Sequence, residues 1–408
     1  MQTILSYGLG VDSSAILLRW LEDPPSRPCP LEDLIVITAQ TGDEYADTRR
    51  DIETHILPRL RAHQVRFVQV ARSGRRQEEG ITVLDDSRAA THLHIEGHYK
   101  LSDELRAAGT VPQFAGEHIC SLKFKAWVIE TWLQQHVGDS SRHAFGYNAE
   151  ETRRIAKSDA AFARRIAFGF NSEEAKRVQK AVAYDNAIRQ SFYPLMEWGW
   201  NRATCIDYLR QKLGVLWQKS SCVYCPFNAL KPEAIDRHKN HPDQVGDALM
   251  LERVSLSLNP RGRLYRDQSL LSITDSSGNE LALDRYRVKL EESQWAVYRV
   301  RRIYQAGKDK LGAISPNKKG HVLRAVEQLT PSLEAQAAAE MLNQLARGSD
   351  QTVHENGITY MYRLRCGTTF PTREEFLVAL PAVVESKARH GLDWFEEKWD
   401  APQRMLFG

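Results

Sequence analysis

Long apolar runs are missing from this sequence of 408 residues. No stretch approaches the roughly 18 consecutive apolar residues that a membrane-spanning helix needs. The N-terminus also lacks the positively charged lead, the purely apolar core and the small-residue cleavage site of a secretion signal. We therefore expect a cytoplasmic protein without a membrane partner.

Cysteine is scarce, and a strong excess of charge of either sign is missing. Six cysteines in a long chain without a secretion signal are poor disulfide candidates, because cytosolic thiols stay reduced. Such cysteines more often bind metal or take part in catalysis. The formal net charge of +3 does not by itself indicate a nucleic-acid partner. The GxxxxGK[ST] pattern is absent too, which argues against an ordinary P-loop ATPase.

What the sequence does contain is an alternation of short apolar runs with helical patterns. The runs that are typical of strands lie at 3–7, 34–39, 65–70 and 143–147. The run at 34–39 is apolar throughout, as in strands that are buried on both faces of a parallel sheet. Helical patterns follow these runs at 13–21, from the end of the TGDEYADT loop (41–48) to about residue 61, and at 122–136. We therefore predict an α/β fold with a doubly wound, mostly parallel sheet.

We expect three regions along the chain. Residues 1–192 form the main α/β domain with an insertion at 72–116, residues 193–258 form a cysteine-rich region, and residues 259–408 form a smaller basic region. After residue 258, the pattern predicts small strands around a Ser-Ser-Gly-Asn turn. From residue 330 on, it predicts mostly helix.

A glycine-bearing turn, SYGLGVDSSA at 6–15, separates the first expected strand from the first helix. Backbone N–H groups and the positive end of the helix dipole meet at such a turn, so an anion would bind there. The alternative is that Asp12 or Ser13 only caps the helix.

Aligned on Asp12 and Ser13, this turn resembles the SGGxDS loop of the N-type ATP pyrophosphatases, or PP-loop superfamily. Their adenine nucleotide α-hydrolase-like (HUP-type) fold is shared with the phosphoadenosine phosphosulfate reductases. Three further segments resemble elements of that family, namely TGDEYADT at 41–48, CSLKFK at 120–125 and GYNAEETR at 146–153. One departure is clear, because Gly8 stands where the family has the loop serine and Leu9 where it has the second glycine. Ser6 is the candidate replacement for the lost hydroxyl.

The resemblance implies an enzyme that binds ATP with Mg²⁺ and releases AMP and pyrophosphate. It implies catalytic roles for Asp12, as a carboxylate on the metal side, and for Lys123 and Arg153 near the phosphates, with Lys125 as a further cation. The residues that it places around the nucleotide are Ser6, Gly8, Gly10, Asp12, Ser13, Ser14, Thr41, Gly42, Glu44, Gly146 and Glu150. For Glu44 and Glu150, charge at a helix N-terminus is the alternative.

The cysteines concentrate in YPLMEWGWNRATCIDYLRQKLGVLWQKSSCVYCPF, at 193–227. The spacing of Cys222 and Cys225 lets two thiolates face one metal. Cys205 lies upstream on an expected helix, and Cys120 is the fourth candidate, which the fold would place at the mouth of the same sheet. Four thiolates satisfy one zinc ion or one [4Fe–4S] cluster. The alternative is four reduced cysteines that bind nothing.

This segment resembles a branch of the phosphoadenosine phosphosulfate reductase-like family with a YPL-x-EWGW-x-R-x-x-C…S-x-C-x-x-CPF signature. Members of the wider superfamily that act in DNA phosphorothioation and tRNA thiolation carry iron–sulfur clusters. The resemblance therefore implies a [4Fe–4S] cluster, with Zn²⁺ as the alternative.

The function that the resemblance implies is ATP-dependent adenylation followed by sulfur transfer to a nucleic acid. The alternatives are a sulfonucleotide (APS/PAPS) reductase and a non-catalytic nucleotide-binding subunit that works with other subunits of a modification or defence complex. Basic side chains in the C-terminal region are candidate contacts for tRNA or DNA, and a solvated basic surface is the other interpretation. These side chains are Arg299, Arg301, Arg302, Lys308, Lys310, Lys318 and Lys319.

Overall fold

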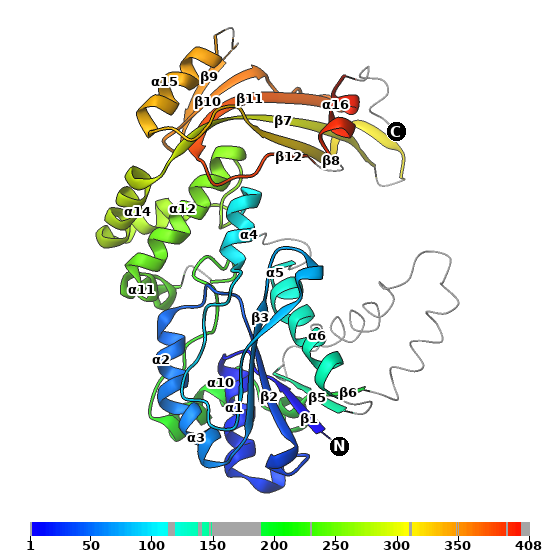
Figure 1. Cartoon of the computed structure of the whole chain (residues 1–408), viewed down its shortest axis with the longest axis vertical. Coiled ribbons are helices and arrows are strands. Elements are labelled where there is room, and N and C mark those ends of the chain that lie inside the picture. Colours follow the sequence, from blue (N-terminus) through cyan, green and yellow to red (C-terminus); the bar gives the residue numbers. More distant parts are fainter. Residues whose placement is uncertain are drawn as a thin grey trace. The chain divides into compact units, whose positions relative to one another are not determined.

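The computed structural model describes residues 2–112, 119–137, 141–146, 148, 189–228, 231–309, 312–347, 349, 351–388 and 391–400. The chain divides into two compact units (Figure 1). The first unit comprises Met1–Leu101 and Glu117–Val223, and the second comprises Ser102–Gly116 and Tyr224–Gly408. This division places parts of the expected cysteine-rich region (193–258) and of the expected insertion (72–116) in each of the two units.

The first unit is built on a six-stranded sheet with the order β4-β3-β2-β1-β5-β6. Its strands are β1 (Gln2–Ser6), β2 (Leu34–Gln40), β3 (Arg66–Arg72), β4 (Ile81–Ser87), β5 (Ser141–Phe145) and β6 (Arg189–Phe192). All neighbouring pairs are parallel except β3 and β4. The four strands expected from apolar runs are confirmed, and so is the α/β class. The run at 34–39 is buried along its whole length, as its composition indicates.

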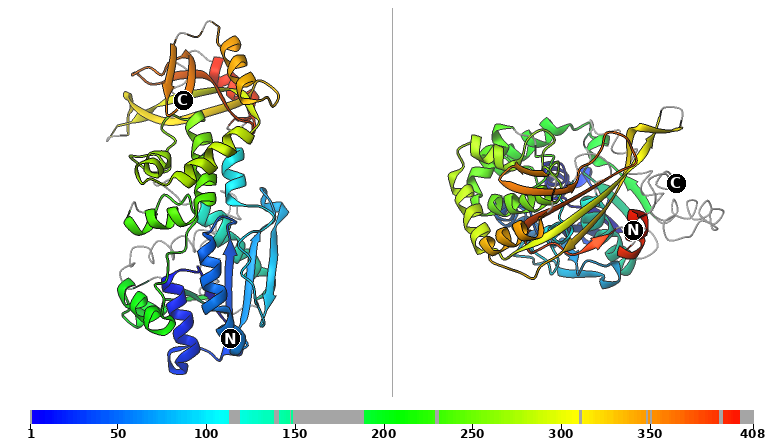
Figure 2. Two further views of the ribbon diagram at one scale, coloured as in Figure 1. Left: turned by 90° about the vertical axis from the view of Figure 1, so that its left-hand side faces the viewer. Right: turned by 90° about the horizontal axis from the view of Figure 1, so that it is seen from above.

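Helices cover both faces of this sheet. Leu5, Val36 and Phe67 pack on one face against residues of α1, α2, α3 and α10, while Ile4, Ile37 and Val68 pack on the other against α6. Figures 1 and 2 show α1 and α2 on the same side of the sheet. The helices are α1 (Val11–Glu22), α2 (Ala46–His55), α3 (Leu57–Ala62), α5 (Ile119–Ser121), a π-helical turn (Leu122–Ala126), α6 (Trp127–His136), α9 (Pro194–Glu197) and α10 (Arg202–Leu213), with 3-10 turns at Pro24–Ser26, Leu31–Asp33 and Gln77–Glu79.

The second unit contains an antiparallel sheet with the order β12-β8-β7-β11-β10-β9. Its strands are β7 (Trp295–Lys308), β8 (Ile314–Gln328), β9 (Gln351–Glu355), β10 (Ile358–Leu364), β11 (Thr372–Pro381) and β12 (Lys387–Ala388). Its helices are α4 (Leu101–Ala108), α11 (Pro232–Asn240), α12 (Pro242–Leu258), α13 (Leu270–Ser276), α14 (Glu280–Glu292), α15 (Ala335–Leu345) and α16 (Leu392–Asp400). None of the described helices in either unit combines the length and the apolar character needed to cross a membrane.

Two expectations for this region were wrong. The Ser-Ser-Gly-Asn turn joins two helices rather than two strands, because Gly278 takes φ +67° at the end of α13 and the Asn279 side chain accepts the N–H of Ala282 at the start of α14. The segment from residue 330 on was expected to be mostly helical, yet it holds β9 to β12. In β10 and β11, buried residues alternate with less buried ones, which is the pattern of a strand.

A buried carboxylate anchors the helical part of the second unit. Glu252 of α12 is only 1% exposed. One of its oxygens accepts the backbone N–H groups of Leu264 (2.7 Å) and Leu270 (2.9 Å), and the other accepts that of Leu271 (3.3 Å). Burial raises the pKa of this carboxyl, while the three backbone bonds favour its charged form. Glu252 therefore fixes the start of α13.

Replacing Glu252 by Ala should lower the free energy of unfolding by about 3 kcal/mol, because three buried N–H groups lose their acceptor. Glu252→Gln should cost about half as much, since it keeps one acceptor oxygen. Urea unfolding followed by circular dichroism measures both changes. Exposed Glu291→Gln on α14 is the control and should change stability by less than about 0.5 kcal/mol. Equal stability of all three variants would contradict the anchoring role.

Candidate nucleotide site at the carboxyl ends of the parallel strands

The strand order of the sheet reverses between β1 and β5. From β1 the chain proceeds through β2 to β3 on one side, and β5 and β6 lie on the other side. In open α/β sheets, ligands bind outside the carboxyl ends of the strands where the order reverses in this way. Ser6 ends β1 and pairs with Phe145, which ends β5. The Ser6 hydroxyl lies 2.5 Å from Nε2 of His143, so a polar contact joins the two strands at this edge.

The loop between β1 and α1 is held from both sides. Leu9 has φ +61°, a conformation that costs a residue with a side chain roughly 1–2 kcal/mol. This is the position where the family resemblance places a glycine. The Leu9 side chain is 3% exposed and belongs to the core beneath the loop, while its carbonyl accepts the indole N–H of Trp217 at 3.2 Å. Burial and this hydrogen bond offset the backbone strain.

The first turn of α1 faces the end of β5. A Cβ atom at Gly146 would lie 3.0 Å from the backbone nitrogen of Ser13 and 3.2 Å from its Cα, so a larger residue would force this contact to widen. The helix begins after Gly10, which is its N-cap residue, and the Ser13 hydroxyl donates to the Gly10 carbonyl at 3.3 Å. The N–H groups of a first helical turn lack intrahelical acceptors. The end of β5 therefore borders the N–H groups that would bind an anion.

Asp12 is held by α10, a contact that was not predicted from the sequence. Its Oδ2 atom lies 2.5 Å from Nη1 of Arg202. Cys205, one turn further along α10, is fully buried and forms a hydrogen bond with Asp12. Burial, and then the charge of Asp12, raise the pKa of Cys205 to about 12. The available signal was the Arg-x-x-Cys spacing, which places both side chains on one face of a helix.

A second polar cluster lies around Glu44, which is 2% exposed. Lys125 Nζ donates to Glu44 at 3.1 Å, and the Ser220 hydroxyl lies 3.3 Å from both carboxylate oxygens. Glu44 also pairs with Cys222 in an isolated antiparallel bridge. The Thr41 hydroxyl lies 3.2 Å from the Cys222 sulfur. Thr41 and Glu44, both expected around the nucleotide, thus hold the 220–222 segment.

Other predicted residues have simpler placements. Gly42 has φ +88°, and an added Cβ would lie 2.6 Å from a side-chain carbon of Lys100, so glycine is required there. Ser14 is buried and its hydroxyl lies 3.0 Å from that of Tyr7. Lys123 is half-buried in the π-helical turn before α6. Glu150 and Arg153 lie outside the described residues.

All four predicted metal ligands lie within the described residues. Cys120 lies in α5, Cys205 contacts Asp12, Cys222 contacts Thr41, and Cys225 belongs to the second unit. Within the described part of the chain, no three His, Cys, Asp or Glu side chains lie together as a metal site. Burial, and then the charge of Glu44, also raise the pKa of Cys222 well above its ordinary value. The metal site expected from these four cysteines stays a prediction.

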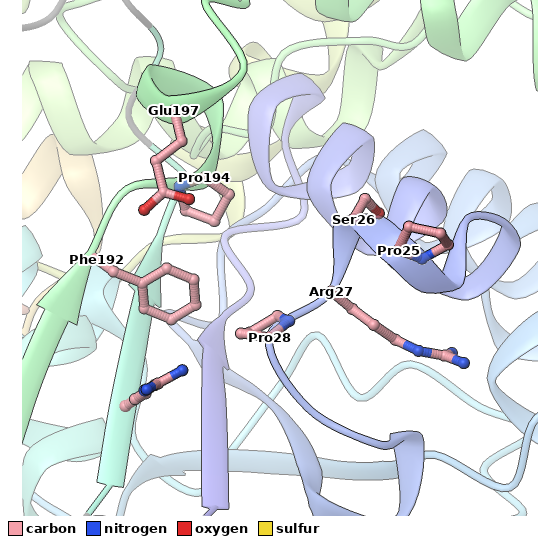
Figure 3. A pocket seen from close by; sticks show the side chains of 8 residues that line it. Pro25, Ser26, Arg27, Pro28, Phe192, Pro194 and Glu197 are labelled. Carbon is pink, nitrogen blue, oxygen red and sulfur yellow. The ribbon is translucent and has the colours of Figure 1, made fainter.

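A cavity of about 390 Å³ lies elsewhere in the first unit. It is bordered by Arg142 of β5, Phe192 of β6, Glu197 of α9 and the 25–28 segment after α1 (Figure 3). Because this segment follows the C-terminal end of α1, the cavity lies at the opposite end of that helix from Asp12. It is therefore separate from the candidate nucleotide site.

Gly146→Ala should push the first turn of α1 away from β5. We expect a loss of about 1–3 kcal/mol in stability and weaker ATP binding, because the Ser13 N–H is displaced. Calorimetric titration with ATP and thermal unfolding measure the two effects. Gln134→Ala, at an exposed position of α6, is the control and should change neither quantity. If Gly146→Ala bound ATP as well as Gln134→Ala does, the placement of the anion site would be wrong.

Three observations bear on function: the strand order, the first turn of α1 and the side chains around that turn. Comparison with known proteins adds nothing to them, because no family model, curated protein or solved structure matches this chain.

Proposed function

We propose that the first unit binds ATP at the carboxyl ends of β1 and β5, and that the protein is an adenylating enzyme that releases pyrophosphate. In this proposal the unit has the HUP-type fold of the PP-loop superfamily. The observation that carries it is the first turn of α1, with Ser13 against Gly146 and Asp12 beside Arg202, at the point where the strand order reverses.

The chemistry follows from the charges that the site would stabilise. A nucleophile attacks the α-phosphorus of ATP, and the bond from that phosphorus to the bridging oxygen breaks, so that pyrophosphate leaves with the electron pair. N–H groups of the first helical turn and the Ser13 hydroxyl would bind the departing phosphates. Arg202 brings a guanidinium to the same turn and offsets the negative charge that develops.

Asp12 has two tasks in this proposal. In the described structure its Oδ2 atom orients Arg202. When ATP brings Mg²⁺, Asp12 is also the residue of this turn whose carboxylate would hold the ion, which offsets phosphate charge. Arg202 adds a guanidinium to the phosphate-binding cations that were expected, Lys123 and Arg153, while Lys125 donates to Glu44.

The acceptor of the adenylate, in our proposal, is a nucleic acid. A sulfur donor at the sulfide level then attacks the adenylated atom, and AMP leaves with the oxygen that the sulfur replaces. No step of this reaction is assigned to the predicted cluster. A non-catalytic nucleotide-binding subunit is the second candidate. The strained, buried Leu9 in the place of a loop glycine favours it, because this loop is less able to adapt to the phosphates.

Asp12→Asn and Arg202→Gln should each lower ATP-dependent pyrophosphate release about a hundredfold or more, since each removes charge from the site of the departing phosphates. Glu22→Gln on α1 and Arg210→Gln on α10 remove the same charges from exposed positions of the same helices and should leave the rate unchanged. A coupled pyrophosphate assay, with acceptor present, measures all four rates.

The outcomes separate the two candidate functions. Binding of ATP without pyrophosphate release by the unmodified protein would favour the non-catalytic subunit. Full activity of Asp12→Asn would refute the proposed site.

The cysteine prediction has its own test. If Cys120, Cys205, Cys222 and Cys225 hold a cluster, protein purified without oxygen should be brown and should contain iron and acid-labile sulfide. Cys222→Ser combined with Cys225→Ser should remove both, whereas Cys29→Ser should not. Metal analysis and the visible absorption spectrum give the answer. Zinc alone would point to the alternative metal, and a colourless, metal-free protein would agree with the described contacts of Cys205 and Cys222.

A further inference from the structure

Two of the arginines expected to contact nucleic acid are engaged inside the second unit. Arg299 donates to Glu327 at 3.1 Å and 2.5 Å. Arg301 is 4% exposed, pairs with Glu396 of α16 and lies over the rings of Phe395 and Trp399. These ion pairs neutralise Arg299 and Arg301, so the two side chains are not available to a phosphate backbone. Lys310 lies outside the described residues.

The other face of β7 holds a buried polar hub, formed by Arg302, Tyr304 and Glu374. Arg302 Nη1 donates to Glu374 at 2.6 Å, and the Tyr304 hydroxyl donates to the same oxygen at 2.9 Å. Arg302 also donates to the carbonyl of Leu258, at the C-terminal end of α12. The one carboxylate of the hub is therefore already shared by two donors.

More cations lie next to this hub than Glu374 can balance. Arg324 of β8 is directly opposite Arg302, and it donates to the carbonyl of Ala108 at 3.1 Å. Burial, and then the charge of Arg302, lower the pKa of Arg324 to about 10. Lys319 Nζ lies 4.3 Å from the ring centre of Tyr304. Like charges that face each other across strands are destabilising unless an anion lies nearby.

Three exposed cations surround the hub, and we call them the cationic rim: Arg261, Lys319 and Arg365. The guanidinium carbon of Arg365 lies 4.3 Å from the ring centre of Tyr362. Arg261 is close enough to Lys319 for its charge, after burial, to lower the lysine pKa. The amide of Phe370 donates to the carbonyl of Pro316 at 2.7 Å, which ties the loop after β10 to the start of β8. The rim thus comes from three segments that the fold brings together.

We propose that the cationic rim binds the phosphodiester backbone of a nucleic acid. This inference rests on the proposed function and adds to it the surface that would bind the nucleic acid to be modified. The reaction depends on residues of the first unit, whereas this binding depends on residues of the second. Phosphate groups would supply the negative charge that the hub lacks, and the tyrosine rings fix Lys319 and Arg365 in place through cation–π contacts.

The exposure of all three rim cations favours a polymer over a small anion. A single phosphate is usually enclosed by converging donors, whereas the rim side chains come from separate segments and remain open to solvent. A nucleic acid offers phosphates at regular intervals, and contacts of this kind do not depend on base sequence. An acidic protein segment is the competing partner, and the test below includes it.

Fluorescence anisotropy with a labelled RNA oligonucleotide and the matching DNA duplex tests the proposal on the full chain without ATP. We expect binding that weakens steeply between about 50 and 200 mM salt. Lys319→Gln combined with Arg365→Gln should lower affinity about tenfold or more and reduce the salt slope by about 2. The control is Arg287→Gln combined with Lys289→Gln on α14, which removes the same charges elsewhere in the second unit and should change neither quantity.

Two further measurements complete the test. Polyglutamate should bind more weakly than either oligonucleotide; equal or tighter binding would overturn the proposal in favour of an acidic protein. The Asp12→Asn variant should bind nucleic acid normally, and the double rim variant should bind ATP normally, so failure of the rim and failure of the nucleotide site are separable. If the α14 control variant lost as much affinity for nucleic acid as the double rim variant, the proposal would also be overturned.

Discussion

The structure of the first unit depends on how closely β5 approaches the first turn of α1. Gly146 lies against the backbone of Ser13, and a single added carbon would open this contact. The same turn is fixed from the other side, where Arg202 and Cys205 of α10 hold Asp12. A helix N-terminus held in this way keeps its N–H groups in place before a ligand arrives, and binding an anion then costs little reorganisation.

Around this turn, residues that were expected to contact the nucleotide serve partly as supports. Thr41 and Glu44 bind the 220–222 segment, and Trp217 binds the carbonyl of Leu9. Residues 193–223 of the cysteine-rich sequence thus stabilise the first unit through hydrogen bonds and packing, and part of this contribution does not depend on their sulfur atoms. Trp198 and Trp200 are examples of this packing, because the Arg19 guanidinium of α1 lies over both indole rings.

The sheet of the first unit could be predicted because its strands are short, continuous apolar runs whose burial depends little on distant residues. Residues 34–39 are one example of such a strand. The glycine turn before α1 could be predicted as well, because glycines between a strand and a helix mark a turn. Arg202 could not be assigned in this way, because its role appears only when α10 packs beside α1.

The second unit was mispredicted for a different reason. The Ser-Ser-Gly-Asn turn suits a hairpin and a helix junction equally well, and the burial of Tyr286 and Leu283 at helical spacing decides between them.

The central claim is that ATP binds at the start of α1 and is cleaved between its α- and β-phosphates. The most direct measurement is to identify the products formed from ATP labelled at the α-phosphorus, in the presence of the purified protein, Mg²⁺ and nucleic acid. The account predicts label in AMP or in an adenylylated acceptor, together with an equal amount of pyrophosphate. Label in ADP with release of inorganic phosphate, or no binding of ATP at all, would contradict it.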